Sequence, residues 1–198
     1  MSREAYAFCE GYVLYPIADD DKDNFVELQR QINGDSTIFL MSAIKDFAWN
    51  TLLSYENDRA YSIYESGGEY CGCIELNNYK DDIPEIALNL VEGKRNQGVA
   101  AKAVKMLVKK LCEERRVDYF LVRIMSDNSH SKHVFEKMGA VLIGEEDRPE
   151  VKLLKELNKL KLEYGEKIAG DTGKHDVDCI DENVFVYKYK LPTGAFIN

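Results

Sequence analysis

The centre of the chain alternates between strand and helix patterns, and this alternation constrains the fold more than any other feature. Residues 83–91 are an apolar stretch of strand length, and residues 99–115 carry apolar side chains at helical spacing, with lysines on the opposite face. Residues 119–125 are almost continuously apolar, which is typical of a buried strand with a parallel neighbour. A strand, a helix and a second strand in this order predict a parallel pair in an α/β fold.

The flanking segments predict further strands and helices. A helix is expected to begin after the acidic run 19–23, where carboxylates favour a helix start, and to end before Asn33. A short helix is expected to end at Gly139. The other segments show strand or helix periodicity and lie at 8–16, 45–55, 60–65, 71–78, 129–138, 140–143 and 184–191.

Residues 147–182 form a charged and polar segment that adds no strand to this succession. Val151, Leu154, Leu157 and Leu160 recur at helical spacing, and most of the remainder reads as a polar loop. We therefore expect a single domain, residues 1–198, with an insertion at 147–182 before the last strand. An exposed apolar stripe on the inserted helix would indicate a partner surface, for example in a homodimer.

Composition and charge restrict the partners and the location that the chain can have. The 198 residues carry a formal net charge of −9, so a nucleic-acid partner, which needs a basic face, is not expected. An acidic surface attracts cationic substrates such as amines, although the same charge also keeps a protein in solution. No apolar run approaches the roughly 20 residues that span a bilayer, and no signal peptide is recognised. Five irregularly spaced cysteines predict a cytoplasmic protein with reduced thiols and no metal site.

A polar loop inside the central unit has the composition of a phosphate site. Arg95, Gly98 and Ala100 lie where this loop opens into the helix. A helix start presents unpaired N–H groups and the positive end of the helix dipole, and small residues there let an anion approach the backbone. Lys94 and Arg95 add positive charge. The loop is neither a Walker loop nor a GxGxxG fingerprint, so a plain turn is the alternative interpretation.

A second polar position follows the next strand. Asn128 stands where that strand gives way to the short helix, and ligands of open α/β sheets bind where parallel strands part at their carboxyl ends. The motif Arg95-x-x-Gly98-x-Ala100 is followed 30 residues after Gly98 by this asparagine and then by a short helix that ends in a glycine. In this order and spacing, residues 83–143 resemble the GNAT acetyltransferases.

The resemblance implies a GNAT fold, with a mixed central sheet of about seven strands, a splayed parallel pair at its centre and flanking helices. It also implies acetyl-CoA as the co-substrate, with the diphosphate on the loop and the thioester in the gap between the strands. The N–H group near Leu90 would polarise the thioester carbonyl. The pattern from Asn128 to Gly139 is most similar to that of the ribosomal-protein N-terminal acetyltransferases. The residues implied in cofactor binding are Leu88, Leu90, Val91, Lys94, Arg95, Asn96, Gln97, Gly98, Val99, Ala100, Ala101, Asn128 and Ser131.

For catalysis the resemblance implies direct attack of an amine on the thioester, which needs a general base and a proton donor. Glu85 matches the position of a catalytic glutamate in some members, and Glu150 is a second candidate after the strand that follows the short helix. Many members carry a tyrosine acid where this chain has Phe135, so Ser131 is the candidate donor. Asn128 is expected to hydrogen-bond the pantetheine or thioester region. A surface glutamate and a surface serine are the structural alternatives for these roles.

Several functions stay open at this point. The first is an N-acetyltransferase whose acceptor is a primary amine of a small molecule or a protein N-terminus. Because Phe135 has no proton to donate, a catalytically inactive acyl-CoA-binding sensor or partner protein is the second. A nucleotide-binding α/β domain is the third, although it lacks the lysine and serine or threonine pair of phosphoryl transfer. His130 and His133 have no obvious third metal ligand and are expected to be exposed. Trp49 and Tyr55 either line the acceptor pocket or pack in the core.

Overall fold

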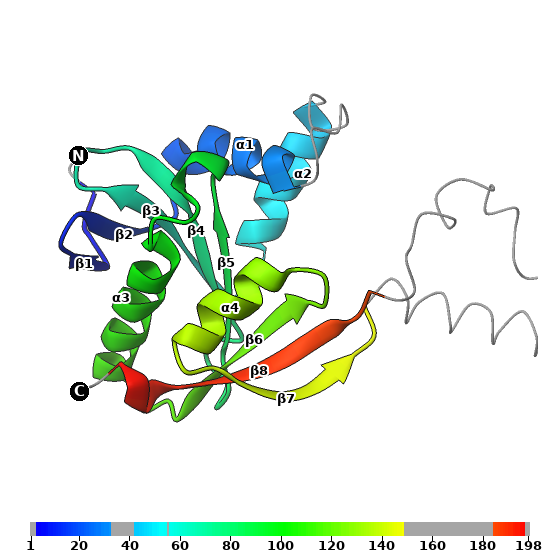
Figure 1. Ribbon diagram of the computed structural model, residues 1–198. Helices are drawn as coiled ribbons and strands as arrows, with labels where there is room; N and C mark the ends of the chain where they lie inside the picture. Colours follow the sequence, from blue (N-terminus) through cyan, green and yellow to red (C-terminus); the bar gives the residue numbers. More distant parts are fainter. Residues whose placement is uncertain (1–2, 33–41, 55, 149–183, 197–198) are drawn as a thin grey trace, which may run out of the picture.

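One mixed sheet runs through the protein, seen in a computed structural model that describes residues 3–32, 42–54, 56–148 and 184–196. Its eight strands lie in the order β1-β2-β3-β4-β5-β6-β8-β7 (Figure 1). Neighbouring strands are antiparallel except for β5 and β6, which are parallel. The strands are β1 (Ala7–Cys9), β2 (Tyr12–Pro16), β3 (Arg59–Glu65), β4 (Tyr70–Asn77), β5 (Glu85–Leu90), β6 (Tyr119–Met125), β7 (Val141–Glu146) and β8 (Val186–Pro192).

The predicted fold class is confirmed, with eight strands in place of about seven. The expected strand 8–16 is in fact a hairpin of β1 and β2, in which Ala7 lies opposite Leu14. The chain reverses at Gly11, whose φ of +85° is a backbone conformation that glycine adopts without steric cost. The hairpin therefore adds the edge strand β1 to the sheet.

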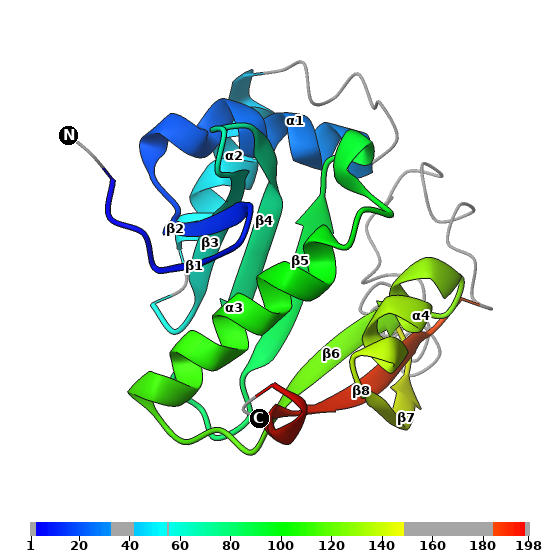
Figure 2. The same cartoon turned by 60° about the vertical axis from the view of Figure 1, so that its left-hand side comes forward.

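In the part of the chain that the structure describes, α-helices cover both faces of the sheet (Figures 1 and 2). Those on one face are α1 (Lys22–Ile32) and α2 (Ser42–Leu53), and those on the other are α3 (Val99–Glu114) and α4 (Ser129–Lys137). Among the described residues, no helix is both long and apolar enough to cross a membrane. Glu150, Tyr55 and nearly all of the expected insertion at 147–182 lie outside the described residues.

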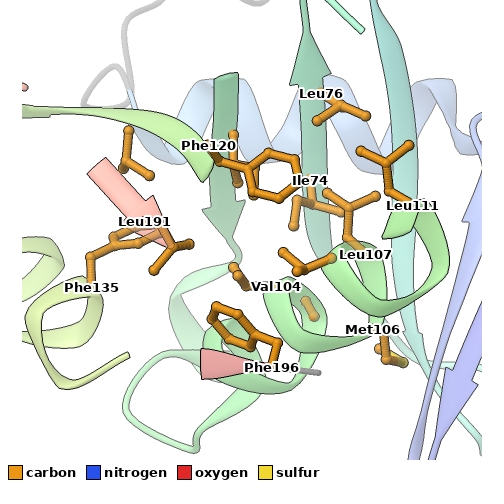
Figure 3. Close-up of a cluster of buried hydrophobic side chains, with 14 of the residues drawn as sticks. Ile74, Leu76, Val104, Met106, Leu107, Leu111, Phe120, Phe135, Leu191 and Phe196 are labelled. Carbon is orange, nitrogen blue, oxygen red and sulfur yellow. The ribbon is translucent and has the colours of Figure 1, made fainter. Parts of the chain in front are cut away.

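The main core lies between α3 and the sheet. Leu107 and Leu111 of α3 are fully buried against Ile74 of β4 and Phe120 of β6, as Figure 3 shows. Each such leucine contributes about 1.5–3 kcal/mol of stability relative to an exposed side chain. A smaller cluster on the opposite face packs α1 and α2 on β4 and contains Phe25, Leu28, Trp49 and Cys73. The two clusters therefore pack against the central strands from both faces of the sheet.

The parallel strands β5 and β6 pair only where they begin. Glu85 and Leu121 form the one registered pair, and the N–H group of Leu121 donates to the carbonyl of Pro84 at 3.0 Å. Beyond this pair the two strands diverge, which is visible in Figure 2. The splayed parallel pair that the resemblance implied is therefore present at the centre of the sheet.

Candidate active site

A cavity of about 760 Å³ lies between α3 and α4 at the open end of the gap. Its walls come from the end of β5, the loop and first turn of α3, most of α4 and the end of α1. Ten of the residues implied in cofactor binding line it, namely Leu88, Leu90, Arg95, Asn96, Gly98, Val99, Ala100, Ala101, Asn128 and Ser131. The structure thus brings residues of β5, of the start of α3 and of α4 together in one cavity.

The start of α3 fits an anion. Gly98 is the N-cap residue with φ +77°, and a Cβ atom built on it would meet no heavy atom within 4 Å. The first helical hydrogen bond runs from the N–H of Lys102 to the carbonyl of Gly98 at 3.2 Å. The N–H groups of the three preceding residues, 99–101, therefore have no acceptor within the helix. These donors and the positive end of the helix dipole face the cavity, so its residues fit the diphosphate of coenzyme A.

Three of the residues implied in cofactor binding do not line the cavity, each for a visible reason. The ammonium group of Lys94 lies 2.7 Å from a carboxylate oxygen of Glu69 and 2.9 Å from one of Glu65, and these hydrogen bonds raise the pKa of Lys94. The amide Nε2 of Gln97 donates to the carbonyl of Gly93 at 2.6 Å. Val91 packs against the smaller core cluster. Of the two cationic side chains in the loop, only Arg95 is left to the cavity.

The backbone of β5 offers hydrogen bonds to the gap. The N–H of Val91 donates to the carbonyl of Cys71 on β4 at 3.0 Å, so residue 91 faces β4. Because successive residues of a strand face opposite neighbours, the N–H and C=O groups of Leu88 and Leu90 point away from β4, into the gap. The guanidinium Nε of Arg95 already donates to the carbonyl of Leu90 at 3.2 Å.

A glycine that sequence reasoning missed supports this end of β5. A Cβ atom on Gly72 of β4 would lie 2.1 Å from the carbonyl oxygen of Asn89 and 2.9 Å from the Cα of Leu90. Gly72 also has φ +155°, which side chains disfavour. The two backbones can therefore approach only because this residue is glycine. A glycine inside a strand pattern is the signal that could have identified it.

Helix α4 presents the residues implied in handling the thioester. Asn128 caps this helix, because its side-chain oxygen accepts from the N–H of Ser131 at 3.0 Å. The amide nitrogen of Asn128 is not used by this bond and can donate to a ligand. Ser131 is half-buried in the cavity wall, and Phe135 is only 6% exposed but also reaches the wall. The serine hydroxyl and the phenyl ring thus share one wall.

Glu85 lies outside this cavity, at the narrow end of the gap. Its neighbour Ile86 is buried in the main core, so strand alternation turns Glu85 to the face that carries α1 and α2. The carboxylate forms an ion pair with Arg123, whose Nε also donates to Glu146 at 2.7 Å. An incoming ammonium group would compete with Arg123 for Glu85.

Glu75, which sequence reasoning did not single out, lies on the same face. It stands opposite Ala87 of β5 and lines a cavity of about 160 Å³ together with Asp58 and Asn77. Burial, followed by the charge of Asp58, raises the pKa of Glu75. The carboxylate has no ion-pair partner in the described part of the chain. No sequence pattern separated this residue from an ordinary strand glutamate.

The structure also places the remaining candidates of the sequence analysis. His130 and His133 are exposed, and both line the rim of the large cavity. No group of three or more potential metal ligands occurs in the described residues. Trp49 is 4% exposed and packs edge-on against Phe25 with ring centroids 5.9 Å apart, so it is a core residue.

Comparison with known families identifies the class. The family described as acetyltransferase (GNAT) domain matches residues 13–141, more than half of the chain, and the chain therefore belongs to the GNAT acetyltransferases. It is accordingly an acetyl-CoA-dependent N-acetyltransferase. A search of curated proteins finds no match. The likeness to the ribosomal-protein branch stays a prediction.

Solved structures of the same fold include spermidine N-acetyltransferases. A SpeG chimera from Vibrio cholerae and hSSAT superimposes with a TM-score of 0.66 at 12% identity, covering 95% of this chain and 99% of that chain. The Vibrio cholerae spermidine N-acetyltransferase in complex with CoA and spermine gives a TM-score of 0.65 at 12% identity, with coverage of 96% and 100%. At such low identity this likeness shows the shared fold alone.

Proposed function

We propose that this enzyme acetylates a primary amine of a small cationic molecule, by direct attack of the amine on acetyl-CoA in the gap between β5 and β6. The observation that carries the proposal is the joining of this gap to the open helix start at Gly98 in one cavity. A turn filled by side chains, or two strands paired along their whole length, would leave no room for the thioester.

Each part of the cavity has a role in this proposal. The N–H groups of residues 99–101 and the guanidinium of Arg95 bind the diphosphate, and the backbone N–H and C=O groups of Leu88 hydrogen-bond the pantetheine arm. The N–H of Leu90 stabilises the negative charge that develops on the thioester oxygen. The amide nitrogen of Asn128 holds the same region from the side of α4.

The transfer moves one acetyl group to the nitrogen, removes two protons from the ammonium group and adds one proton to the departing thiolate. The amine must lose its extra proton before attack, and Glu85 accepts it through water. The nitrogen then bonds to the carbonyl carbon, the carbon–sulfur bond breaks, and the departing thiolate takes a proton from Ser131. Water returns a proton to the serine, and the second amine proton leaves to solvent. No covalent intermediate with the enzyme is involved.

Charge on the opposite face supports a cationic acceptor. Glu75, Asp58 and Glu85 lie on the side of the sheet that carries α1 and α2, where Arg59 and Arg123 are the neighbouring cations, and the chain as a whole has a net charge of −9. Such a surface attracts ammonium groups. The spermidine N-acetyltransferases of the same fold are named for an acceptor of this kind. We further propose that residues 1–198 act as one cytoplasmic domain, with a homodimer to be checked by light scattering.

Thiol release from acetyl-CoA tests the proposal. We expect turnover with at least one polyamine in a panel that also contains amino sugars, amino acids and peptides. Acetyl-CoA is expected to raise the melting temperature, whereas ATP at the same concentration is not. Tight acetyl-CoA binding without thiol release on any amine would instead identify an acyl-CoA sensor. Glu85→Gln should lower kcat while the Kd of acetyl-CoA is unchanged, and an unaltered kcat would remove Glu85 as the base.

A further inference from the structure

The large cavity differs in charge from the rest of the molecule. The chain has 35 acidic residues against 26 lysines and arginines, yet no carboxylate lines this cavity among the described residues. Its titratable lining side chains are all basic and are Arg95, His130, His133 and Lys137. The cavity therefore favours an anionic ligand, whereas the acidic surface around it does not.

Three of these side chains lie along one flank of α4. His130, His133 and Lys137 are spaced i, i+3 and i+7, which places them in a row on a helix. The opposite flank faces β8, where the ammonium of Lys132 lies 4.2 Å from the ring centroid of Tyr187. Glu136 on that flank accepts a hydrogen bond from Tyr189 at 3.0 Å. Helix α4 thus turns one flank to the sheet and presents the other, which carries no acid, to the cavity.

Coenzyme A brings a second anionic group that the helix start does not account for. Its diphosphate is matched by residues 98–101 and Arg95, but its ribose also carries a 3′-phosphate. Lys94 cannot supply the charge, because Glu65 and Glu69 hold its ammonium group. The far rim, formed by Gln31 and Ile32 of α1, has no charge to offer.

We propose that the row His130, His133 and Lys137 binds the ribose 3′-phosphate of the coenzyme, an inference that rests on the proposed function. Only a ribose separates this phosphate from the diphosphate, so an occupied helix start brings it to the adjacent walls of the same cavity. Lysine supplies a point charge, and each imidazole supplies an N–H donor. The row makes the enzyme selective for coenzyme A over its 3′-dephospho form.

Calorimetric titration with coenzyme A and with 3′-dephospho-coenzyme A tests this selectivity directly. The wild-type enzyme is expected to bind the dephospho form about tenfold more weakly, as for the loss of one charge-assisted contact. A combined His130→Asn, His133→Asn, Lys137→Gln variant should bind both forms within twofold of each other. Lys132→Gln, which removes a charge from the opposite flank of the same helix, should keep the wild-type ratio. Circular dichroism of both variants checks that the helix is intact.

The outcomes separate this inference from the proposed function. A wild-type enzyme that binds both forms equally, or a triple variant that keeps the tenfold ratio, overturns the role of the row and leaves the acetyltransferase assignment intact. An equal loss of affinity for both forms in the triple variant also overturns the role of the row, since the effect would not depend on the 3′-phosphate. A wild-type enzyme that binds neither form would instead contradict the proposed function.

Discussion

Gly98→Ala is the sharpest test of the anion site at the start of α3. Gly98 has φ +77°, and alanine in this left-handed conformation costs about 1–2 kcal/mol of stability. Its methyl group would occupy space that is empty to 4 Å and that borders the N–H groups of residues 99–101. Loss of one charge-assisted hydrogen bond to the diphosphate, worth about 1.5–3 kcal/mol, raises the Kd of acetyl-CoA about 10- to 100-fold.

Gly11→Ala provides the matched control. Gly11 has φ +85° and equally empty surroundings, but it lies in the hairpin between β1 and β2, outside the cavity. Both variants should lose a similar free energy of unfolding in urea, whereas only Gly98→Ala should lose affinity in calorimetric titration with acetyl-CoA. A Gly98→Ala enzyme that is destabilised like the control but binds acetyl-CoA as the wild type does would refute the assignment of this helix start.

Three further substitutions test the surroundings of the site. Gly72→Ala needs a backbone shift of about 1.3 Å in β5 before its Cβ atom reaches an ordinary contact distance. It should therefore cost about 1–3 kcal/mol in urea unfolding and raise the KM for acetyl-CoA. Gly67→Ala, whose surroundings are open, is the neutral control. Burial raises the pKa of Glu75, so the folded state binds the carboxyl proton more tightly than the unfolded state does and loses stability as pH rises. Because glutamine carries no charge at any pH, Glu75→Gln should raise Tm at pH 7 but not below about pH 4. Burial alone would raise the pKa of Asp21, but the hydrogen bond from Arg3 at 2.9 Å helps to hold this pKa below its usual value. Asp21→Asn should therefore lower the free energy of unfolding by about 3 kcal/mol at pH 7. The loss should shrink as pH falls below about 4, where the wild-type carboxylate becomes protonated. Equal effects at both pH values would contradict the last two predictions.

The central unit could be predicted because its determinants are local. The helical stripe of α3, the apolar run of β6 and the glycine after α4 each depend on neighbours within a few residues, and each lies where expected. The turn within residues 8–16 was not predicted, although Gly11 interrupts the strand pattern there. A single glycine in a short apolar stretch does not distinguish a turn from a bulge.

The missed parts of the site depend on contacts between distant segments. Lys94 is adjacent to Arg95 in sequence, but its two carboxylate partners come from β3 and the turn before β4, which no local pattern places near the loop. The elevated pKa of Glu75 arises from burial among several elements and from Asp58 on a neighbouring segment. The charged flank of α4 is periodic in the sequence, yet only the fold shows that it faces the same cavity as Gly98.

The absent tyrosine acid raises the question of which group protonates the departing thiolate. Phe135, which the resemblance puts at the usual position of that acid, is 6% exposed and lines the cavity one helical turn beyond Ser131. Ser131 is the remaining hydroxyl in this wall among the described residues. Its hydroxyl can be removed without loss of the helix cap, because the cap uses the backbone N–H of Ser131.

Ser131→Ala should therefore lower kcat about 10²-fold, the lower end of the usual contribution of a general acid, with little change in the Kd of acetyl-CoA. Adding Phe135→Tyr to that variant places a hydroxyl on the same wall. It should raise kcat at least about tenfold above that of Ser131→Ala, since a phenol can also donate the proton. Stopped-flow measurement of thiol release separates this step from binding. Wild-type kcat in Ser131→Ala would show that water protonates the thiolate unaided, and a loss that tyrosine does not rescue would indicate that the serine positions the thioester rather than donating a proton.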